Sequence, residues 1–187
     1  MIEVDVPKKE GRVNTIQVEL PLTQEKVLAL RAGDSVRLHG EMYIARDAAH
    51  KRLMALIEAG EELPVELSGA CIYYAGPCPA APGELIGPCG PTTSGRMDAY
   101  TPALIDRGLC AMVGKGARSA AVVAAMRGRA VYFAATGGAA VLIAQSIVSV
   151  ETVAFDDLGP EALRRIVVRD FPAIVAVDAC GGDLYAR

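Results

Sequence analysis

Short segments in which polar and apolar residues alternate, or apolar residues run together, recur along the chain and predict strands. Gly40 lies inside the second of these segments and is compatible with either one strand or a hairpin at that point. The predicted strand segments are residues 15–22, 35–45, 70–76, 109–114, 130–136, 146–155, 164–170 and 173–179.

Residues 46–60, "RDAAHKRLMALIEAG", show the helical period most clearly. Asp47 can cap the start of this helix and Gly60 can end it. Its apolar face is formed by Ala49, Leu53, Leu56 and Ile57. A second helix is predicted over residues 119–128, with Ser119 as its cap, and two shorter helical stretches accompany these.

Residues 76–91 are rich in proline and glycine, and we expect them to form a surface loop. No internal repeat and no change of composition marks a linker. Strands somewhat outnumber helices in this prediction. The sequence therefore predicts one α/β domain over residues 1–187.

Composition narrows the class of protein further. The chain has 187 residues, of which 52% are hydrophobic and 22% charged, as in a globular domain. Its net charge of -3 and its lack of a dense Lys/Arg run argue against a nucleic-acid or membrane-surface partner. The sequence shows no secretory signal and no apolar stretch of the ~20 residues that a bilayer requires. We therefore expect a cytoplasmic protein.

The cysteines do not form a recognisable metal-binding pattern. No two of the five stand as a CxxC pair, and the chain has only two histidines, His39 and His50. A self-contained zinc or iron–sulfur site is therefore not expected, so no metal ligand is assigned. Reduced and mostly buried thiols are predicted for Cys71, Cys78, Cys89, Cys110 and Cys180.

Three cations stand beside predicted breaks in structure: Arg46, Arg96 and Lys115. Arginines at helix starts can hold a carboxylate through two parallel hydrogen bonds. Lys115 lies between two glycines, which allow a ligand to approach the backbone closely. The hydroxyl groups of residues 92–94 add hydrogen-bond donors. Together these groups suit a small dicarboxylic acid.

Each of these features also has a simpler interpretation. A surface arginine and a neighbouring aspartate such as Asp47 usually form a solvent-exposed ion pair. The hydroxyl groups of residues 92–94 can serve simply to cap a helix. His50, followed by two basic residues, is more often a surface residue than a catalyst. Gly116 follows Lys115 where a nucleotide-binding P-loop has Ser or Thr. The residues alone therefore predict an anion-binding α/β domain and nothing more specific.

Three motifs, "RDAAHKR", "GPTTSGRMD" and "MVGKG", stand in this order along the chain. In this order and spacing the sequence resembles the β subunit, or carboxy-terminal region, of the iron–sulfur-dependent hydro-lyases. That family includes class I fumarate hydratase and L-tartrate dehydratase. The resemblance implies a swivelling β/β/α fold, in which helices are packed against a curved or barrel-like sheet layer.

The resemblance also implies a division of labour. A [4Fe–4S] cluster would be ligated by an α subunit, so that no cofactor is expected on this chain alone. Thr92, four residues before Arg96, would act in proton transfer. Arg46, Arg96 and Lys115 would bind the substrate carboxylates. The supporting residues would be Asp47, His50 and Thr93.

The implied reaction is the reversible dehydration of (S)-malate to fumarate, in an enzyme that is active only with its α subunit and that assembles as α2β2. Two alternatives stay open. One is the β subunit of L-tartrate dehydratase, which forms oxaloacetate from tartrate. The other is a binding module that keeps the anion pocket without catalysis.

Overall fold

The computed structural model describes residues 15–135 and 139–186, and within these ranges seven strands form one sheet. The first five strands run parallel, in the order β1-β2-β3-β4-β5. The strand bounds are β1 Ile16–Leu20, β2 Ser35–Ile44, β3 Cys71–Tyr73, β4 Ala111–Gly114, β5 Val131–Ala134, β6 Ile147–Ala154 and β7 Leu163–Val177.

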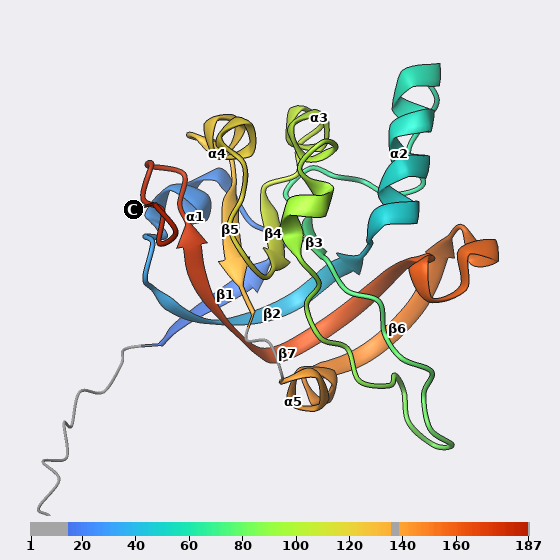
Figure 1. Ribbon diagram of the computed structural model, residues 1–187. Coiled ribbons are helices and arrows are strands. Elements are labelled where there is room, and N and C mark those ends of the chain that lie inside the picture. The colour runs from blue at the N-terminus through green and yellow to red at the C-terminus, as the bar shows by residue number, and fades with distance from the viewer. Residues whose placement is uncertain (1–14, 136–138, 187) are drawn as a thin grey trace, which may run out of the picture.

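The long strand β7 closes the sheet into a barrel. It pairs antiparallel with β5 at one edge and antiparallel with β2 along most of its length. Strands β2, β3, β4, β5 and β7 therefore form a closed ring, while β1 extends β2 and β6 extends β7 (Figure 1). This barrel-like layer with helices against it confirms the fold that the family resemblance implies.

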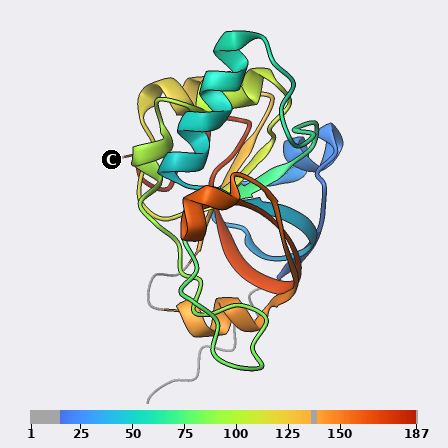
Figure 2. The ribbon, with the colours of Figure 1, turned by 90° about the vertical axis from the view of Figure 1, so that its right-hand side faces the viewer.

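The helices lie mainly on one side of the barrel. Figures 1 and 2 show α2, α3 and α4 together above the strands, with α5 at the opposite end. Two 3₁₀ turns, η1 and η2, both contact α2. The bounds are α1 Gln24–Ala29, α2 Asp47–Ala59, η1 Ser94–Met97, α3 Thr101–Asp106, α4 Ala120–Met126, α5 Ala140–Gln145 and η2 Asp156–Glu161.

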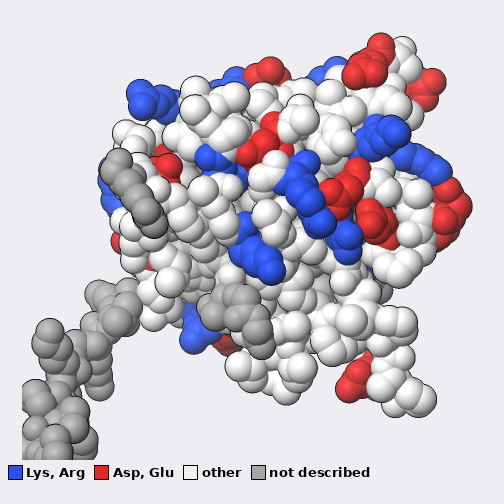
Figure 3. Space-filling view, in the orientation of Figure 1, with Lys and Arg blue, Asp and Glu red and all other residues white. Residues whose placement is uncertain are grey.

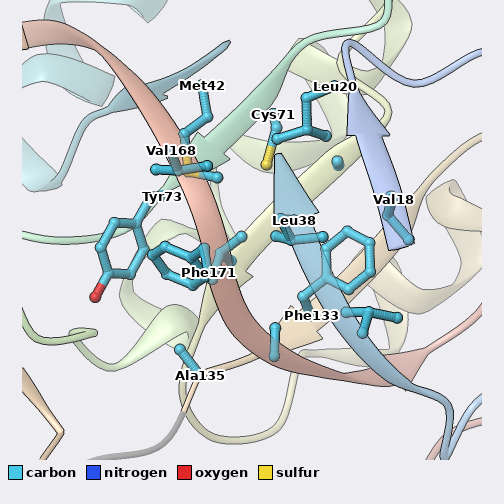
Figure 4. Close-up of a cluster of buried hydrophobic side chains, with 14 of the residues drawn as sticks. Val18, Leu20, Leu38, Met42, Cys71, Tyr73, Phe133, Ala135, Val168 and Phe171 are labelled. Carbon is cyan, nitrogen blue, oxygen red and sulfur yellow. The ribbon is translucent and has the colours of Figure 1, made fainter. Parts of the chain in front are cut away.

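Alternation along the central strands separates two hydrophobic cores. Cys71 and Tyr73 of β3 point into the barrel, whereas Ile72 and the following Tyr74 point to the helices. The same two-residue period holds in β4 and β5, as expected for strands buried on both faces. Figure 4 shows the barrel interior, where Tyr73 meets Phe171 edge to face at 5.2 Å.

The structure decides between the two alternatives left open at Gly40 and removes one predicted break in a strand. Gly40 does not turn a hairpin: β2 runs through it as one strand, with a φ of 103° that suits glycine. The register shift beside it places the extra residue on β7, between Val168 and Phe171. Residues 164–170 and 173–179 were predicted as separate strands, yet β7 runs through both positions. Asp170, with φ 54°, and Pro172 deform β7 locally, but its pairing with β2 continues past them.

No helix within the described residues has the length and apolar character needed to span a membrane. The start of the chain, where no secretory signal is expected, and the Gly137–Gly138 pair lie outside the described ranges.

Candidate active site

The predicted site residues gather at the carboxyl ends of neighbouring parallel strands. Arg46 comes two residues after β2, and Lys115 directly follows β4. Tyr74 directly follows β3, and the chain returns along it so that Thr92 lies beside it. Carboxyl ends of parallel strands meet at one edge of a sheet, where α/β proteins commonly bind ligands. Topology thus brings together segments far apart in the sequence.

Backbone hydrogen bonds join the "TTSGR" and "GKG" motifs. The Lys115 N–H donates to the Thr92 carbonyl at 3.2 Å, and the Ser94 N–H donates to the Lys115 carbonyl at 2.9 Å. Thr93 forms a β-bridge with Lys115 and is otherwise exposed. The two motifs are therefore one structural unit, and Arg96 is carried on the η1 turn that begins at Ser94.

Gly114 allows this turn to approach β4 closely. A Cβ atom at Gly114 would overlap the hydroxyl oxygen of Ser94 and lie 3.0 Å from the ring of Tyr74. Ser94 is fully buried, and its hydroxyl lies 2.9 Å from the hydroxyl of Tyr132 on β5. The glycines on either side of Lys115 suggested that a ligand can approach the backbone closely. At Gly114 this close approach is made by the η1 turn of the protein itself.

Arg46 and Arg96 converge on one carboxylate. The Asp47 Oδ2 atom lies 3.5 Å from Nε of Arg46 and 3.3 Å from Nη2 of Arg96. These are ion-pair distances without the angles of a hydrogen bond, since Oδ2 has no hydrogen-bond partner. Asp47 therefore holds the two guanidinium groups near each other, as a carboxylate ligand would.

Glu161, at the end of η2, holds Arg46 from the other side. Its Oε1 lies 3.1 Å from Nη2 of Arg46, and its Oε2 accepts the N–H of Ala48 at 2.9 Å. The predicted cap is therefore wrong: Arg46 is the N-cap residue of α2, and the remote Glu161 binds a free N–H of the first turn. Gly76 leaves room for Arg46, because a Cβ there would lie 2.5 Å from Nη1.

His50 is fully buried, which corrects the simpler interpretation of it as a surface residue. Its Nδ1 donates to the Arg46 carbonyl at 2.9 Å, so the proton is on Nδ1 and Nε2 is an acceptor. The imidazole packs edge-on against Tyr74 at 5.3 Å. Burial lowers the pKa of His50 from 6.5 to about 4, so the ring is neutral at pH 7.

The buried side-chain polar atoms without a hydrogen-bond partner, counted over residues 15–135 and 139–186, all belong to one segment. They are Nε of Arg46, Oδ2 of Asp47 and Nε2 of His50. Buried polar atoms are normally paired, and an orphaned one requires a reason. Two of them, Nε of Arg46 and Oδ2 of Asp47, face each other in an ion pair that Arg96 also joins. Three such atoms within five residues indicate a site that a ligand or another polypeptide completes.

Thr92 is anchored through both its backbone and its side chain. Its N–H and its hydroxyl donate to the carbonyl of Tyr74, at 2.8 Å and 3.0 Å. The hydroxyl oxygen therefore keeps its lone pairs as acceptors. Lys115 is exposed. Figure 3 shows basic side chains, interspersed with acidic ones, over the region where α2 begins and η1 lies.

The cysteines do not fit an iron–sulfur or zinc site. Cys71, Cys89 and Cys110 are buried, and burial raises the pKa of Cys89 to about 12 and that of Cys110 to about 11. Metal ligation needs the thiolate, which these environments disfavour. Cys78 and Cys180 are exposed, which departs from the mostly buried thiols predicted. No three His, Cys, Asp or Glu side chains within the described ranges are grouped to hold a metal ion.

Size alone does not locate this site. A hollow of about 470 Å³ lies at the amino ends of β3 and β4, next to Gly69 and Cys110, and none of the predicted site residues lines it. The convergent polar groups, which give a ligand site its specificity, lie at the carboxyl ends instead.

Sequence reasoning missed several residues that support the site. Glu161 is 115 positions after Arg46 and carries no local signal. Asp98 and Arg118 belong to the motif regions "GRMD" and "GKGAR", and their ion pair lies directly beneath the η1 turn. Their place next to the motifs is the one signal that could have drawn attention to them.

Comparison with known proteins identifies the family of the chain. Residues 2–187 match the family described as "Fumarase C-terminus". The chain is 39% identical to the anaerobic class I fumarate hydratase of Escherichia coli (strain K12) over 96% of its own length and 34% of that protein. It is 36% identical to fumarate hydratase 2 of Leishmania major, over 98% of this chain and 34% of that one.

The chain thus spans about a third of the length of these fumarate hydratases. A relative of similar length is a protein of Methanocaldococcus jannaschii, named as a candidate L(+)-tartrate dehydratase subunit beta. It is 38% identical to this chain, and the match covers 88% of each. Both the family match and these relatives span most of the sequence, including all three motifs. The chain therefore belongs to the fumarase carboxy-terminal family.

Proposed function

We propose that this chain is the β subunit of a two-subunit hydro-lyase and that its reaction is the reversible dehydration of (S)-malate to fumarate. One observation carries the proposal. Two guanidinium groups converge on one carboxylate oxygen, and this oxygen, Nε of Arg46 and Nε2 of His50 are buried without a hydrogen-bond partner. Such an arrangement suits a dicarboxylic acid, whose carboxylates would bind guanidinium groups that are already held in place. Lys115, joined to the same turn, provides a third cation.

The cations bind and orient the substrate. Arg46, fixed by Glu161, and Arg96, on its turn, hold carboxylate groups through charge-assisted hydrogen bonds. In dehydration a proton leaves the carbon next to one carboxylate, and negative charge builds on that group. Cations already in place stabilise this charge without having to reorganise. The same contacts favour the reverse hydration.

Thr92 is the proposed proton-transfer residue. Its oxygen would take the proton from carbon during dehydration and return it during hydration. A neutral threonine is a weak base, so its own proton must leave to a stronger one. The Tyr74 carbonyl, which accepts the Thr92 hydroxyl, cannot take that proton. We assign the stronger base to the partner subunit.

An α-type partner would also carry the [4Fe–4S] cluster of this enzyme class, because the cysteines of this chain do not fit one. The partner would then supply activation of the leaving hydroxyl group. The lengths support this division, since the fumarate hydratases matched are about three times as long as the matching region. By family analogy the assembly would be α2β2.

L-tartrate dehydration is a second candidate, favoured by one observation. A relative named for a tartrate dehydratase β subunit is close to this chain in length, and the match covers 88% of each protein. Tartrate offers the same two carboxylates to the cations and differs by an additional hydroxyl group. A binding module without catalysis would keep the cations but would not require Thr92.

The test is an anaerobic assay of this chain alone and mixed with a cluster-reconstituted α chain. Malate and tartrate are offered separately. Activity in the mixture alone supports the two-subunit enzyme, and the preferred acid decides between the two reactions. A stable complex with an intact cluster that dehydrates neither acid would contradict both.

A further inference from the structure

A charged side chain is buried beneath the candidate site. The guanidinium of Arg118, whose side chain is 0% exposed, lies between two aromatic rings. Its central carbon is 5.3 Å from the ring centre of Tyr74 and 5.1 Å from that of Tyr132. Stacking of this kind suits the flat, weakly hydrated guanidinium better than an ammonium group.

Polar contacts fix the guanidinium in its plane. Its Nε donates to Oδ1 of Asp98 at 2.7 Å, and Nη2 donates to the Thr101 hydroxyl at 2.8 Å. Its Nη1 lies 3.6 Å from the sulfur of Met112. Asp98 is itself only 15% exposed, and its second oxygen accepts the N–H of Ser119 at 2.6 Å.

Stability does not account for this pair. The desolvation of two buried charges costs about as much as their attraction returns, and well-packed apolar residues often replace such a pair without loss. The helix-facing core, to which the neighbouring Met112 and Tyr132 belong, also holds the fully buried Leu104, Val122 and Met126. A cation at this position therefore has a different role from filling the core.

The contacts of Arg118 lead to the site from two directions. Asp98 ends the η1 turn two residues after Arg96, and through Ser119 it also ties down the segment that follows Lys115. Tyr132, under the guanidinium, donates its hydroxyl to the Gly116 carbonyl at 2.9 Å and also bonds Ser94. One buried group thus contacts the supports of both motifs.

We propose that Arg118 is a positioning residue, which through Asp98 and Tyr132 fixes the orientation of Arg96 and Lys115 toward the substrate. The kinetic part of its test rests on the function proposed above. Loss of the guanidinium fork should loosen residues 92–98 and 115–119 while the barrel stays intact. Methionine at position 118 keeps the apolar stem and removes the fork.

The first experiment is amide hydrogen exchange on the full chain with Arg118→Met, and with Arg118→Met/Asp98→Asn should the single variant fold poorly. Faster exchange confined to residues 92–98 and 115–119 supports the proposal. Unchanged exchange in these segments, or uniform acceleration along the whole chain, overturns it. Arg129→Met is the matched control, because Arg129 forms a 2.7 Å ion pair with Asp106 on the surface. We expect that variant to exchange like the wild type.

The second experiment is a double-mutant cycle in the assembled enzyme. Arg118→Met should lower kcat/KM about 10- to 100-fold, as misplacement of binding groups does. Combined with Arg96→Ala it should cost less than the product of the two single effects, since the part of the Arg118 effect that passes through Arg96 is then already lost. Arg118→Lys should recover part of the loss. Multiplicative effects would overturn the positioning role.

The two experiments separate failure of this proposal from failure of the proposed function. An assembled wild-type enzyme that dehydrates neither malate nor tartrate would contradict the function. Hydrogen exchange would still decide whether Arg118 fixes the two site segments, because it needs neither substrate nor partner.

Discussion

At the scale of single residues, the three cations differ in how the chain holds them. Arg46 is 26% exposed in its side chain and is paired with both Glu161 and Asp47. The Arg96 side chain is 47% exposed, and within the described residues its one ion pair is with Asp47. Lys115 is exposed. Arg46 is thus placed before substrate arrives, whereas Arg96 has freedom to move from Asp47 to a substrate carboxylate.

Replacement of Arg96 and of Thr92 should separate binding from proton transfer. In the assembled enzyme, Arg96→Ala should lower kcat/KM by about two orders of magnitude, or ~3 kcal/mol of lost charge-assisted contact. Thr92→Ala should lower kcat and leave KM nearly unchanged. Steady-state kinetics with Arg107→Ala, an exposed arginine after α3, provides the control. Near-normal kinetics of the Arg96 variant would refute its role, and a pure KM effect would make Thr92 a binding residue.

The sequence carried enough information to bring Arg46, Thr92, Arg96 and Lys115 into one hypothesis, because their motifs are local. It could not show that Glu161 holds Arg46, since that contact depends on how η2 packs against α2. The burial of His50 was also out of reach. Basic neighbours in the sequence suggested solvent, but helical geometry turns its ring inward toward Tyr74.

At the scale of elements, the site depends on a close approach between η1 and β4. The strand has no side chain at Gly114, and Ser94 occupies that space. The motif therefore needs glycine at this position for packing, independently of any ligand.

Two alanine substitutions in neighbouring motifs test this packing. Gly114→Ala should lower the free energy of unfolding by about 1–3 kcal/mol, because the added methyl group meets Ser94 and Tyr74 in a filled core. Gly95→Ala is the matched control, since the nearest atom to its Cβ would be 3.9 Å away. Urea unfolding of the isolated chain measures both. Equal stability of the two variants would show that the turn can move away from β4 at little cost.

Element prediction succeeded where a pattern is local and failed where tertiary pairing decides. Alternation located all of the strands within the described residues, and Ser119 does cap α4, accepting the N–H of Val122 at 3.4 Å. Residues 164–170 and 173–179 were predicted as two strands, yet pairing with β2 carries β7 across Asp170 and Pro172. Barrel closure was implied by the family resemblance and not by the pattern, because the pairing of β2 with β7 joins residues at least 120 positions apart.

At the scale of the whole molecule, the barrel and the helices enclose a histidine that is neutral when the protein is folded. Burial lowers the pKa of His50 to about 4, whereas its ordinary value is 6.5. Between these values an unfolded chain binds a proton at His50 that the folded chain does not. Acidification therefore favours unfolding in this window. The contribution of His50 is complete above pH 6.5 and is lost as the pH falls toward 4.

This linkage predicts the pH dependence of global stability. Between pH 7.5 and pH 5, His50 should account for a loss of about 2 kcal/mol in the free energy of unfolding. His50→Asn keeps a donor for the Arg46 carbonyl but does not titrate, so its stability should fall less steeply over this range. Urea unfolding at the two pH values gives, for each protein, the change in the free energy of unfolding with pH. The difference between the two proteins cancels the contribution of the acidic groups that they share.

His39→Asn removes the other histidine and should keep the steep wild-type slope, because His50 is unchanged in it. If His50→Asn also kept that slope, the ring would have to accept a proton in the folded state. A protonated Nε2 would then need an acceptor, and among residues 15–135 and 139–186 it has no hydrogen-bond partner. The rings that pack against it are those of Tyr74 and Tyr100. Equal slopes would therefore mean that the segment from Arg46 to His50 opens to solvent in acid. The site would then come apart under conditions in which the barrel stays folded.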